Sequence, residues 1–409
     1  MQVQDLDGSN PTKTAIDSSF FTGDPTNSIG DPRLIYDAAD DRFIMSWLGF
    51  DYPGQKGPTD GGDSWCDVAV SATNDPRGAW NKYSFHVRRN GTQQMDFDSL
   101  GYDSKAIYVT GRMRTAAGTM VVGNRILILN KATALSGGML TPTFIDDVAL
   151  PNNVGLAEII KPVEPLDAAA LSGPTFFLTE SGKNALVLYT LNDPLGTHTI
   201  NSTKIPITTW ASAAGAAPQQ GGADLPDDDA GFVLQKTTQR NGVIWTAQTV
   251  SATGMSGGRA GVIVYKINPT AGTLIKQYEI SDSTLSYYVP AVVPDSAGNA
   301  AVVFTASGAN SFASIFYARY EAAADKFDLP YVVAEGTTTY NSPAGQGIAW
   351  GDYFDAAPDV TSGNLVWLHG ELAVSTTTWQ MRAARVKTDA PTLHCTAQSL
   401  PAGVSCEAG

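Results

Sequence analysis

The chain has 409 residues, of which 43% are hydrophobic and only 16% are charged, with a formal net charge of −14 at pH 7. Together with its 40 glycines, this composition is typical of a folded, turn-rich protein and argues against an intrinsically disordered chain. The negative charge repels nucleic acids and anionic membranes, so we expect no nucleic acid as a partner and favour cations or neutral ligands such as glycans.

The chain repeats one strand pattern six times, beginning with GDPRLIYDAADDRFIMSW at residues 30–47. In each copy a first strand, usually a tight polar turn and a second strand rich in β-branched and aromatic residues follow one another. The predicted first strands are 33–37, 99–103, 158–162, 232–236, 291–295 and 356–360. The predicted second strands are 42–48, 106–112, 175–181, 243–249, 301–307 and 365–371.

Each repeat continues with a third strand, and five repeats offer a fourth. The third strands are expected at 67–72, 125–130, 185–190, 261–266, 315–320 and 381–386. The fourth strands are expected at 82–87, 143–148, 204–209, 276–281 and 331–336. A repeat of about 60 residues with four strands is the signature of a β-propeller.

We therefore predict an all-β fold, a six-bladed β-propeller of four-stranded antiparallel blades over residues 1–388. The sixth repeat lacks an obvious fourth strand, and a strand from the N-terminal segment, such as 14–21, would supply it and close the ring. Seven blades are the alternative if residues 1–29 hold more than one strand.

The long links between strands predict a binding face. Segments 49–65, 211–231 and 336–355 join second to third strands or one blade to the next, and such links emerge on the same face of a propeller. Variable loops gathered on one face of a rigid scaffold usually mark the binding face.

The tail, residues 389–409, has two interpretations. It resembles a fragment of the immunoglobulin-like modules that often follow secreted bacterial propellers, which would make the chain one piece of a longer protein. Alternatively, it is a C-terminal extension. A disulfide between Cys395 and Cys406 would indicate an extracellular or cell-surface location, with Cys66 left as a buried thiol. No apolar run in the sequence is long enough to span a membrane.

The turn at residues 71–80 resembles the Asp-box of sialidase-like propellers, through Ser71, Asp75, Gly78 and Trp80. We interpret this turn, and similar ones at 191–199 and 267–274, as structural. Arg33 lies where sialidases place their first arginine. The other arginines their chemistry requires have no counterparts at the equivalent strand tips, so a true sialidase is disfavoured.

The start of the first repeat, GDPRLIYD, resembles the first inner strand of arabinanase-type and invertase-type glycosidases. Those families place two Asp and one Glu at the starts of inner strands, which implies Asp31, Asp98 and Glu158 as catalytic candidates. Glycoside hydrolysis uses one carboxylate as base or nucleophile and a second as proton donor, and a third carboxylate can tune their pKa values. The alternative is structural, because such carboxylates also accept hydrogen bonds from neighbouring blades.

A second group of candidates lies in WGDYFDAAPD of the sixth repeat. Trp350, Asp352, Tyr353 and Asp355 would approach the channel from the same face as Asp31, and Glu371 at the end of the next strand is a further catalytic candidate. An aromatic ring beside carboxylates suits a sugar, although Trp350 and Tyr353 could instead fill the wedge between blades one and six. Arg33, Trp65 and Arg112 complete the candidates for substrate binding.

Two acidic loops raise the question of calcium, an ion that takes six to eight oxygen ligands and tolerates irregular loops. The candidate ligands are Asp60, Asp63, Asp227, Asp228 and Asp229, and solvated acidic loops are the alternative. The four histidines are widely separated, which argues against zinc. The sequence contains no phosphate-binding or dinucleotide-binding motif, so we expect neither a nucleotide nor a flavin.

Three functions remain open. The sequence favours an extracellular carbohydrate-active enzyme, a glycoside hydrolase with Asp31 as base or nucleophile, Asp98 as modulator and Glu158 or Glu371 as the acid. The first alternative is a non-catalytic cell-surface propeller that binds glycan or protein and holds structural calcium. The second is a polysaccharide lyase, with Tyr353 as base and Arg33 neutralising a uronate.

Overall fold

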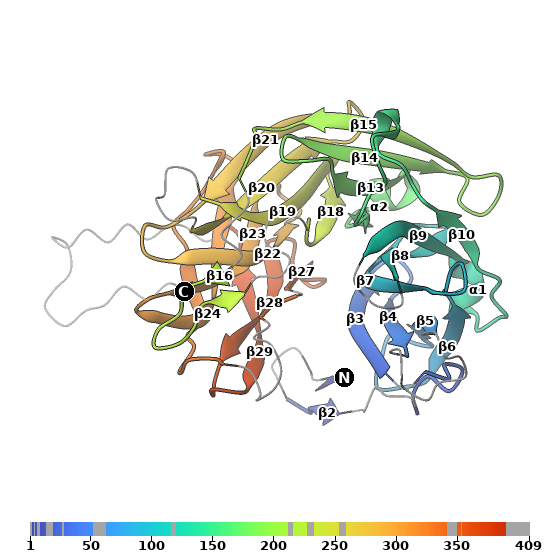
Figure 1. Ribbon diagram of the computed structural model, residues 1–409, viewed down its shortest axis with the longest axis horizontal. Helices are drawn as coiled ribbons and strands as arrows, with labels where there is room; N and C mark the ends of the chain where they lie inside the picture. The colour runs from blue at the N-terminus through green and yellow to red at the C-terminus, as the bar shows by residue number, and fades with distance from the viewer. Residues whose placement is uncertain are drawn as a thin grey trace, which may run out of the picture.

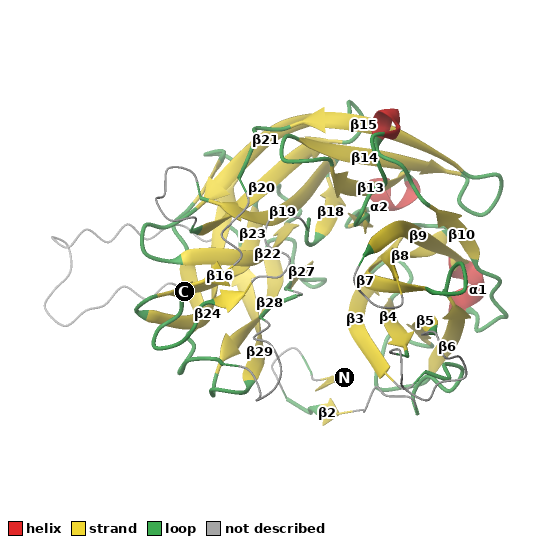
Figure 2. Cartoon of the chain, in the orientation of Figure 1, coloured by secondary structure: helices red, strands yellow, loops and turns green. Residues whose placement is uncertain are grey.

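A computed structural model describes residues 2–3, 5, 9–13, 19–26, 28–51, 63–115, 120–211, 216–226, 233–252, 259–341, 350–352 and 354–389. Its strands form six small sheets in a ring around a central axis (Figures 1 and 2), which confirms the prediction of an all-β, six-bladed propeller. None of the described helices could cross a membrane, since none is long and apolar enough.

Blades one and two are four-stranded antiparallel sheets, as predicted. Blade one consists of β3 (Ser28–Asp37), β4 (Arg42–Phe50), β5 (Ser64–Ser71) and β6 (Trp80–His86). Blade two consists of β7 (Gln93–Tyr102), β8 (Ala106–Thr115), β9 (Val121–Asn130) and β10 (Thr143–Asp146), with helix α1 (Lys131–Leu135) before its last strand.

Blades three and four share a connection near the axis. Blade three contains β11 (Lys161–Pro162), β13 (Thr175–Glu180), β14 (Ala185–Asn192) and β15 (Thr199–Pro206), and the 3-10 helix η1 (Pro151–Asn153) precedes it. Blade four contains β18 (Thr237–Arg240), β19 (Val243–Ser251), β20 (Ala260–Asn268) and β21 (Thr273–Ile280). Between β11 and β13 lie β12 (Glu164–Pro165), which pairs in parallel with β18, and helix α2 (Ala168–Ser172).

The inner strand of blade four differs from its prediction at 232–236. The observed strand is β18, which begins at Thr237, directly after the predicted strand ends, and residues 233–236 belong to no strand. The reason is a charge within the apolar run: Lys236 turns into the central cavity and forms an ion pair with Glu164.

Blade five contains β22 (Ser286–Pro294), β23 (Ala300–Gly308), β24 (Ser311–Glu321), β25 (Lys326–Phe327) and β26 (Tyr331–Ala334). Blade six contains β27 (Asp355–Pro358), β28 (Leu365–Ala373) and β29 (Trp379–Lys387). A small hairpin of β16 (Ala216–Ala217) and β17 (Leu225–Pro226) lies between blades three and four in the chain.

The described part of the chain contains no fourth strand on blade six. The N-terminal strands β1 (Gln2–Val3) and β2 (Thr12–Lys13) pair with each other instead of with β29. Of the expected closing strand, residues 14–18 lie outside the described residues, while Phe20 and Phe21 pack on blade one. Figure 1 shows the N-terminus in the space between β29 and β3.

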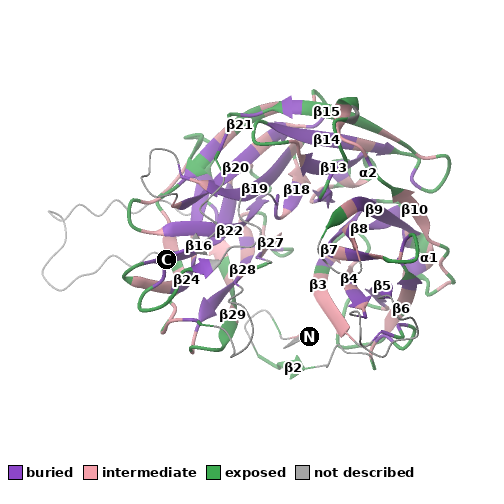
Figure 3. Ribbon diagram, viewed as in Figure 1, coloured by how far each residue is buried: buried purple, intermediate pink, exposed green. Residues whose placement is uncertain are grey.

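Buried residues lie along the strands throughout the ring (Figure 3), and the hydrophobic core is divided among the interfaces between blades. Separate clusters of buried side chains join blades one and two, two and three, three and four, four and five, and five and six. Successive residues of a strand face opposite neighbours. Ile244 therefore packs toward blade three and Trp245 toward blade five. No cluster of described residues joins blades six and one.

Candidate functional site

The inner strands of three blades carry the same β-bulge. The pairing shifts between Gly30 and Arg33 in β3, between Asp96 and Ser99 in β7, and between Tyr288 and Ala291 in β22. The first residue of each bulge has a positive φ, 57° at Asp31, 52° at Phe97 and 54° at Val289. Bulges redirect side chains next to functional sites, and aspartate tolerates this backbone conformation better than most residues.

Asp31 and Asp98 are thus the first and second residues of equivalent bulges in neighbouring blades. The Asp98 side chain is fully buried, and its Oδ2 accepts a hydrogen bond of 2.7 Å from Ser46 Oγ. Arg33 Nε lies 3.6 Å from Asp98 Oδ1, and the same guanidinium donates to the Asp98 carbonyl oxygen. Burial raises the pKa of Asp98 to about 7; the charge of Arg33 opposes this shift and that of Asp31 reinforces it.

Three cations surround the ring of Phe97. The charged groups of Arg33, Arg112 and Lys161 lie 5.7, 5.3 and 4.8 Å from its centroid. The bulge causes this convergence, because it turns the Phe97 ring toward blades one and three. Three cations around one aromatic ring, beside a buried carboxyl, form an electrostatically strong site at the end of the channel.

Arg112 connects this group to blade three. Its Nε lies 2.6 Å from Asp96 Oδ2, and its Nη1 lies 3.5 Å from Glu158 Oε1. The Glu158 side chain is 60% exposed, so this carboxylate faces solvent at the edge of the group. The structure therefore brings together Asp31, Asp98 and Arg33 with Arg112 and Glu158.

Glu371 and Asp352 form a second acidic group on blade six. Glu371 is 8% exposed, and its Oε1 has no hydrogen-bond partner. Burial, reinforced by the charge of Asp352, raises the pKa of Glu371 to about 7. Gly351 makes this position possible, since a Cβ on Gly351 would lie 3.2 Å from Glu371 Oε1.

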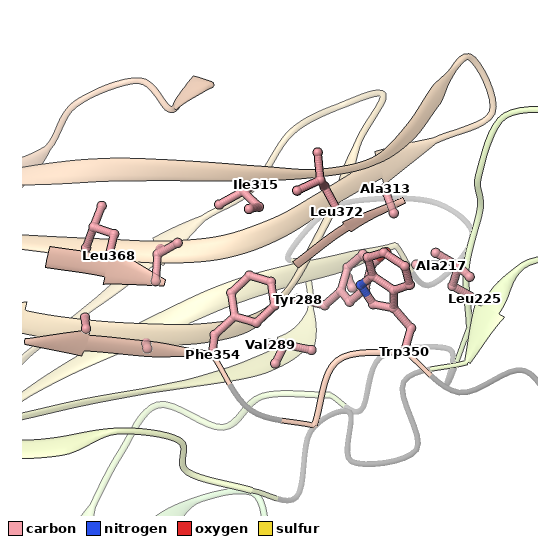
Figure 4. Close-up of a cluster of buried hydrophobic side chains, with 14 of the residues drawn as sticks. Ala217, Leu225, Tyr288, Val289, Ala313, Ile315, Trp350, Phe354, Leu368 and Leu372 are labelled. Atoms are coloured by element: carbon pink, nitrogen blue, oxygen red, sulfur yellow. The ribbon is translucent and has the colours of Figure 1, made fainter. Parts of the chain in front are cut away.

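Trp350 belongs to the core. It is 4% exposed, its Nε1 donates to Thr305 Oγ1 at 3.2 Å, and its ring packs against Tyr340. Figure 4 shows it among Tyr288, Val289 and Ala217, on the side of the cluster away from Leu368. The ring therefore has no open face for a sugar, and it fills the interface of blades five and six instead of that of blades six and one.

Several predicted residues lie elsewhere or outside the described residues. Trp65 points toward the outer strand of blade one, where its Nε1 donates to Asp63 Oδ2 and its ring contacts His86. Asp63 also accepts from the Ser64 amide and lies 2.6 Å from His86 Nε2, so its oxygens are occupied by protein groups. Tyr353, Asp60, Asp227, Asp228, Asp229, Cys395 and Cys406 lie outside the described residues. Cys66 is buried and unpaired, as expected.

No group of three or more His, Cys, Asp or Glu side chains able to hold a metal occurs within the described ranges. Calcium thus remains a prediction for the loops that hold Asp60 and Asp227. The Asp-box-like turn has the structural role expected for it. Asp75 Oδ1 accepts from the Arg77 amide, and Trp80 Nε1 donates to the Pro76 carbonyl oxygen.

Sequence reasoning missed Glu180, at the end of β13. Burial, reinforced by the charge of Glu158, raises the pKa of Glu180 to about 8. The Gln248 amide, in the orientation that satisfies its neighbours, donates to Glu180 and accepts from Trp210 Nε1 at 3.1 Å and from Tyr265 OH at 3.2 Å. Glu180 stands in a run otherwise resembling a core strand, and no local signal distinguishes it.

Sequence reasoning placed Asp355 at the channel but missed Lys236 and Glu164, which form an ion-paired triad with it. Lys236 Nζ lies 2.5 Å from Glu164 Oε2 and 3.1 Å from Asp355 Oδ1. The three residues line a central cavity of about 360 Å³, which the inner strands of blades one to four and six enclose. Here a signal existed, because Lys161 and Lys236 each interrupt an apolar inner-strand run, and a buried lysine requires a charged partner.

Comparison with known proteins supports the fold. No protein-family profile and no curated protein sequence matches the chain. A protein of unknown function from Dyadobacter fermentans has a similar structure, with a TM-score of 0.50 and 10% identity over 87% of this chain and 94% of that one. A sialidase from Streptococcus pneumoniae gives a TM-score of 0.49 at 11% identity, over 93% of this chain and 71% of that one.

An endo-arabinase from Bacteroides thetaiotaomicron gives a TM-score of 0.37 at 13% identity, over 75% of this chain and 94% of that one. Sialidases and arabinanases are thus among the structures that the chain resembles, in agreement with the weak resemblance seen in the sequence. At these identities the similarity concerns the fold alone, and the chemistry has to be argued from the site.

Proposed function

We propose that the chain is a glycoside hydrolase whose active centre lies at the long-loop end of the channel, at the bulges of blades one and two. The observation that carries this proposal is the pairing of Asp31 with Asp98, a fully buried carboxyl whose pKa is raised to about 7. A carboxyl group whose pKa is raised by its environment, beside a second carboxyl group, is an arrangement that suits glycoside hydrolysis.

In this proposal each carboxyl has its own role. Asp31 is the base or nucleophile, and Asp98, in the adjacent bulge, tunes its reactivity. Arg33 donates to the Asp98 carbonyl oxygen and forms an ion pair with the Asp98 carboxyl group. Glu371 is the proton donor, because its pKa of about 7 keeps much of it protonated at neutral pH. Glu158 is less suited to this role, since its side chain is 60% exposed at the edge of the group and ion-paired with Arg112.

The proposed substrate is a polysaccharide, and the proposed location is extracellular or at the cell surface. Arg33, Arg112 and Lys161 would bind acceptor groups of the sugar chain beside Phe97. The low content of charged residues and the net charge of −14 favour a glycan over a nucleic acid as the partner.

A reducing-sugar assay over a panel of plant and microbial polysaccharides tests the proposal. We expect the wild-type protein to release reducing ends from at least one substrate, and Asp31→Asn to abolish the release without lowering the melting temperature. A product that absorbs in the ultraviolet because it is unsaturated would instead indicate a lyase and would refute hydrolysis.

A second candidate is a non-catalytic glycan-binding propeller. It is favoured because the charged groups of the site are already paired with each other or buried. Arg112 is paired with Asp96 and Glu158, and Asp98 is inaccessible to solvent. Binding on a glycan array that is equal for the wild type and Asp31→Asn, with no turnover of the bound glycan, would support this candidate against the enzyme.

A further inference from the structure

A second cavity, which we call the lower cavity, opens at the other end of the channel. It has a volume of about 490 Å³ and is lined by the hairpin residues Ala38 and Ala39 of blade one and Val360 of blade six, together with part of helix α2. These short hairpins lie at the opposite end of the inner strands from the bulges. The lower cavity is therefore separate from the proposed active centre and adjoins the central cavity only at Glu164, Lys236 and Asp355 and their apolar neighbours.

The wall of the lower cavity is apolar and aromatic. Leu34 and Val360, which are 45% and 62% exposed, are large hydrophobic side chains open to this space. The rings of Tyr36, Phe43 and Tyr102 line the same space. Exposed apolar side chains gathered in one concave site indicate a ligand, and the volume lies in the range of small-molecule pockets.

The floor and rim of the lower cavity carry an excess of negative charge. Three carboxylates, from Glu164, Asp355 and Asp167, face one ammonium group, that of Lys236. Asp167 accepts hydrogen bonds from the amides of Ala170 and Asn241, and the charge of Arg240 interacts with it from outside the cavity lining. The Asp355 side chain is 43% exposed. Its Oδ1 forms an ion pair with Lys236 and accepts a hydrogen bond from the Ala356 amide, and its Oδ2 has no partner among the described residues.

We propose that the lower cavity binds a small amphipathic cation, an organic ammonium compound with an apolar or aromatic body. The body would pack against Leu34, Tyr36 and Val360, and the ammonium group would reach the open oxygen of Asp355. Aromatic rings add a favourable cation–π interaction, and an apolar wall with few polar groups orients such a ligand. Anions are excluded by the carboxylates, and neutral analogues lose the charge-assisted contact.

Isothermal titration calorimetry with benzylammonium, benzyl alcohol and benzoate tests this assignment on the full chain. We expect benzylammonium to bind at least about ten-fold more tightly than benzyl alcohol, and benzoate not to bind. Asp355→Asn should weaken benzylammonium binding about ten-fold while leaving benzyl alcohol unchanged.

A second variant keeps the test decisive if Asp355→Asn fails to fold. Leu34→Trp should fill the lower cavity and abolish binding of both benzylammonium and benzyl alcohol. Leu195→Trp is the matched control, because Leu195 is also 45% exposed but lies outside the cavity. The proposal is overturned if benzylammonium does not bind, if benzoate binds as tightly, or if Leu34→Trp and Leu195→Trp bind benzylammonium equally.

Discussion

The pH dependence of stability should be strongest at Asp67, on β5 in blade one. This side chain is fully buried, and neither of its oxygens has a hydrogen-bond partner of good geometry. Asp24 of the N-terminal segment lies beside it, with Oδ1 bound to the Thr26 amide and hydroxyl and Oδ2 unpartnered. Burial, opposed by a contact with Ser84 and reinforced by the charge of Asp24, raises the pKa of Asp67 to about 8.

The direction of this pKa shift determines whether stability rises or falls with pH. The folded state holds the Asp67 proton more tightly than the unfolded chain, whose aspartate pKa is about 4. The stabilisation is therefore complete below about pH 4 and is lost as the pH rises through 8. The free energy of unfolding should fall by about 1.4 kcal/mol per pH unit in this interval, or up to about 4 kcal/mol from pH 5 to pH 8.

Asp67→Asn keeps the shape of the side chain and removes the titration. Urea unfolding, followed by tryptophan fluorescence, should give similar free energies for the wild type and Asp67→Asn at pH 5, and a more stable variant at pH 8. Asp75→Asn, in an exposed turn of the same blade, is the matched control and should leave the pH profile unchanged. Parallel profiles for Asp67→Asn and wild type between pH 5 and pH 8 would refute the reasoning.

Three further predictions concern other parts of the ring. Glu371→Gln should abolish hydrolysis without unfolding the protein. Wild-type activity should decline above about pH 7 as Glu371 loses its proton, and pH–rate profiles of the wild type and the variant measure both effects on activity. Lys236→Met should lower the free energy of unfolding, measured with urea, by about 3–5 kcal/mol, because it leaves Glu164 buried without its counter-charge. Adding Glu164→Gln should recover much of this stability, whereas a further loss in the double variant would contradict this account. Gly49→Ala should cost about 1–3 kcal/mol, because its Cβ would lie 1.7 Å from Asp24 Oδ2; an unchanged melting temperature would show that the segment moves aside freely.

The repeated second strands explain why most of the fold could be predicted from sequence. The predicted second strands, from 42–48 to 365–371, lie inside observed strands to within one residue at their ends, since a buried central strand is recognised from its own apolar run. The inner strands were less predictable, because their pairing is interrupted by bulges and, in blade four, by Lys236. The N-terminal segment packs through Phe20 and Phe21 on blade one, a long-range contact that local pattern does not encode.

The candidate site was predictable only where a motif marked it. The Asp-Pro start of the first repeat indicated Asp31, and the resemblance to arabinanase-type and invertase-type glycosidases implied Asp98, although the two occupy successive and not identical bulge positions. Glu180 was missed because its environment comes from Gln248 on the neighbouring blade. Trp350 remained a candidate for sugar binding as well as for the core, because an aromatic residue beside an aspartate looks the same in sequence whether it is buried or open.

The central claim is that Asp31 takes part in cleaving a glycosidic bond. The most direct measurement is the initial rate of reducing-sugar release by wild type, Asp31→Asn and the control Asp75→Asn, on a polysaccharide found active in the panel. The account predicts loss of activity in Asp31→Asn alone, with equal melting temperatures for the three proteins. Full activity in Asp31→Asn, or no release by the wild type from any polysaccharide that it binds, would contradict it.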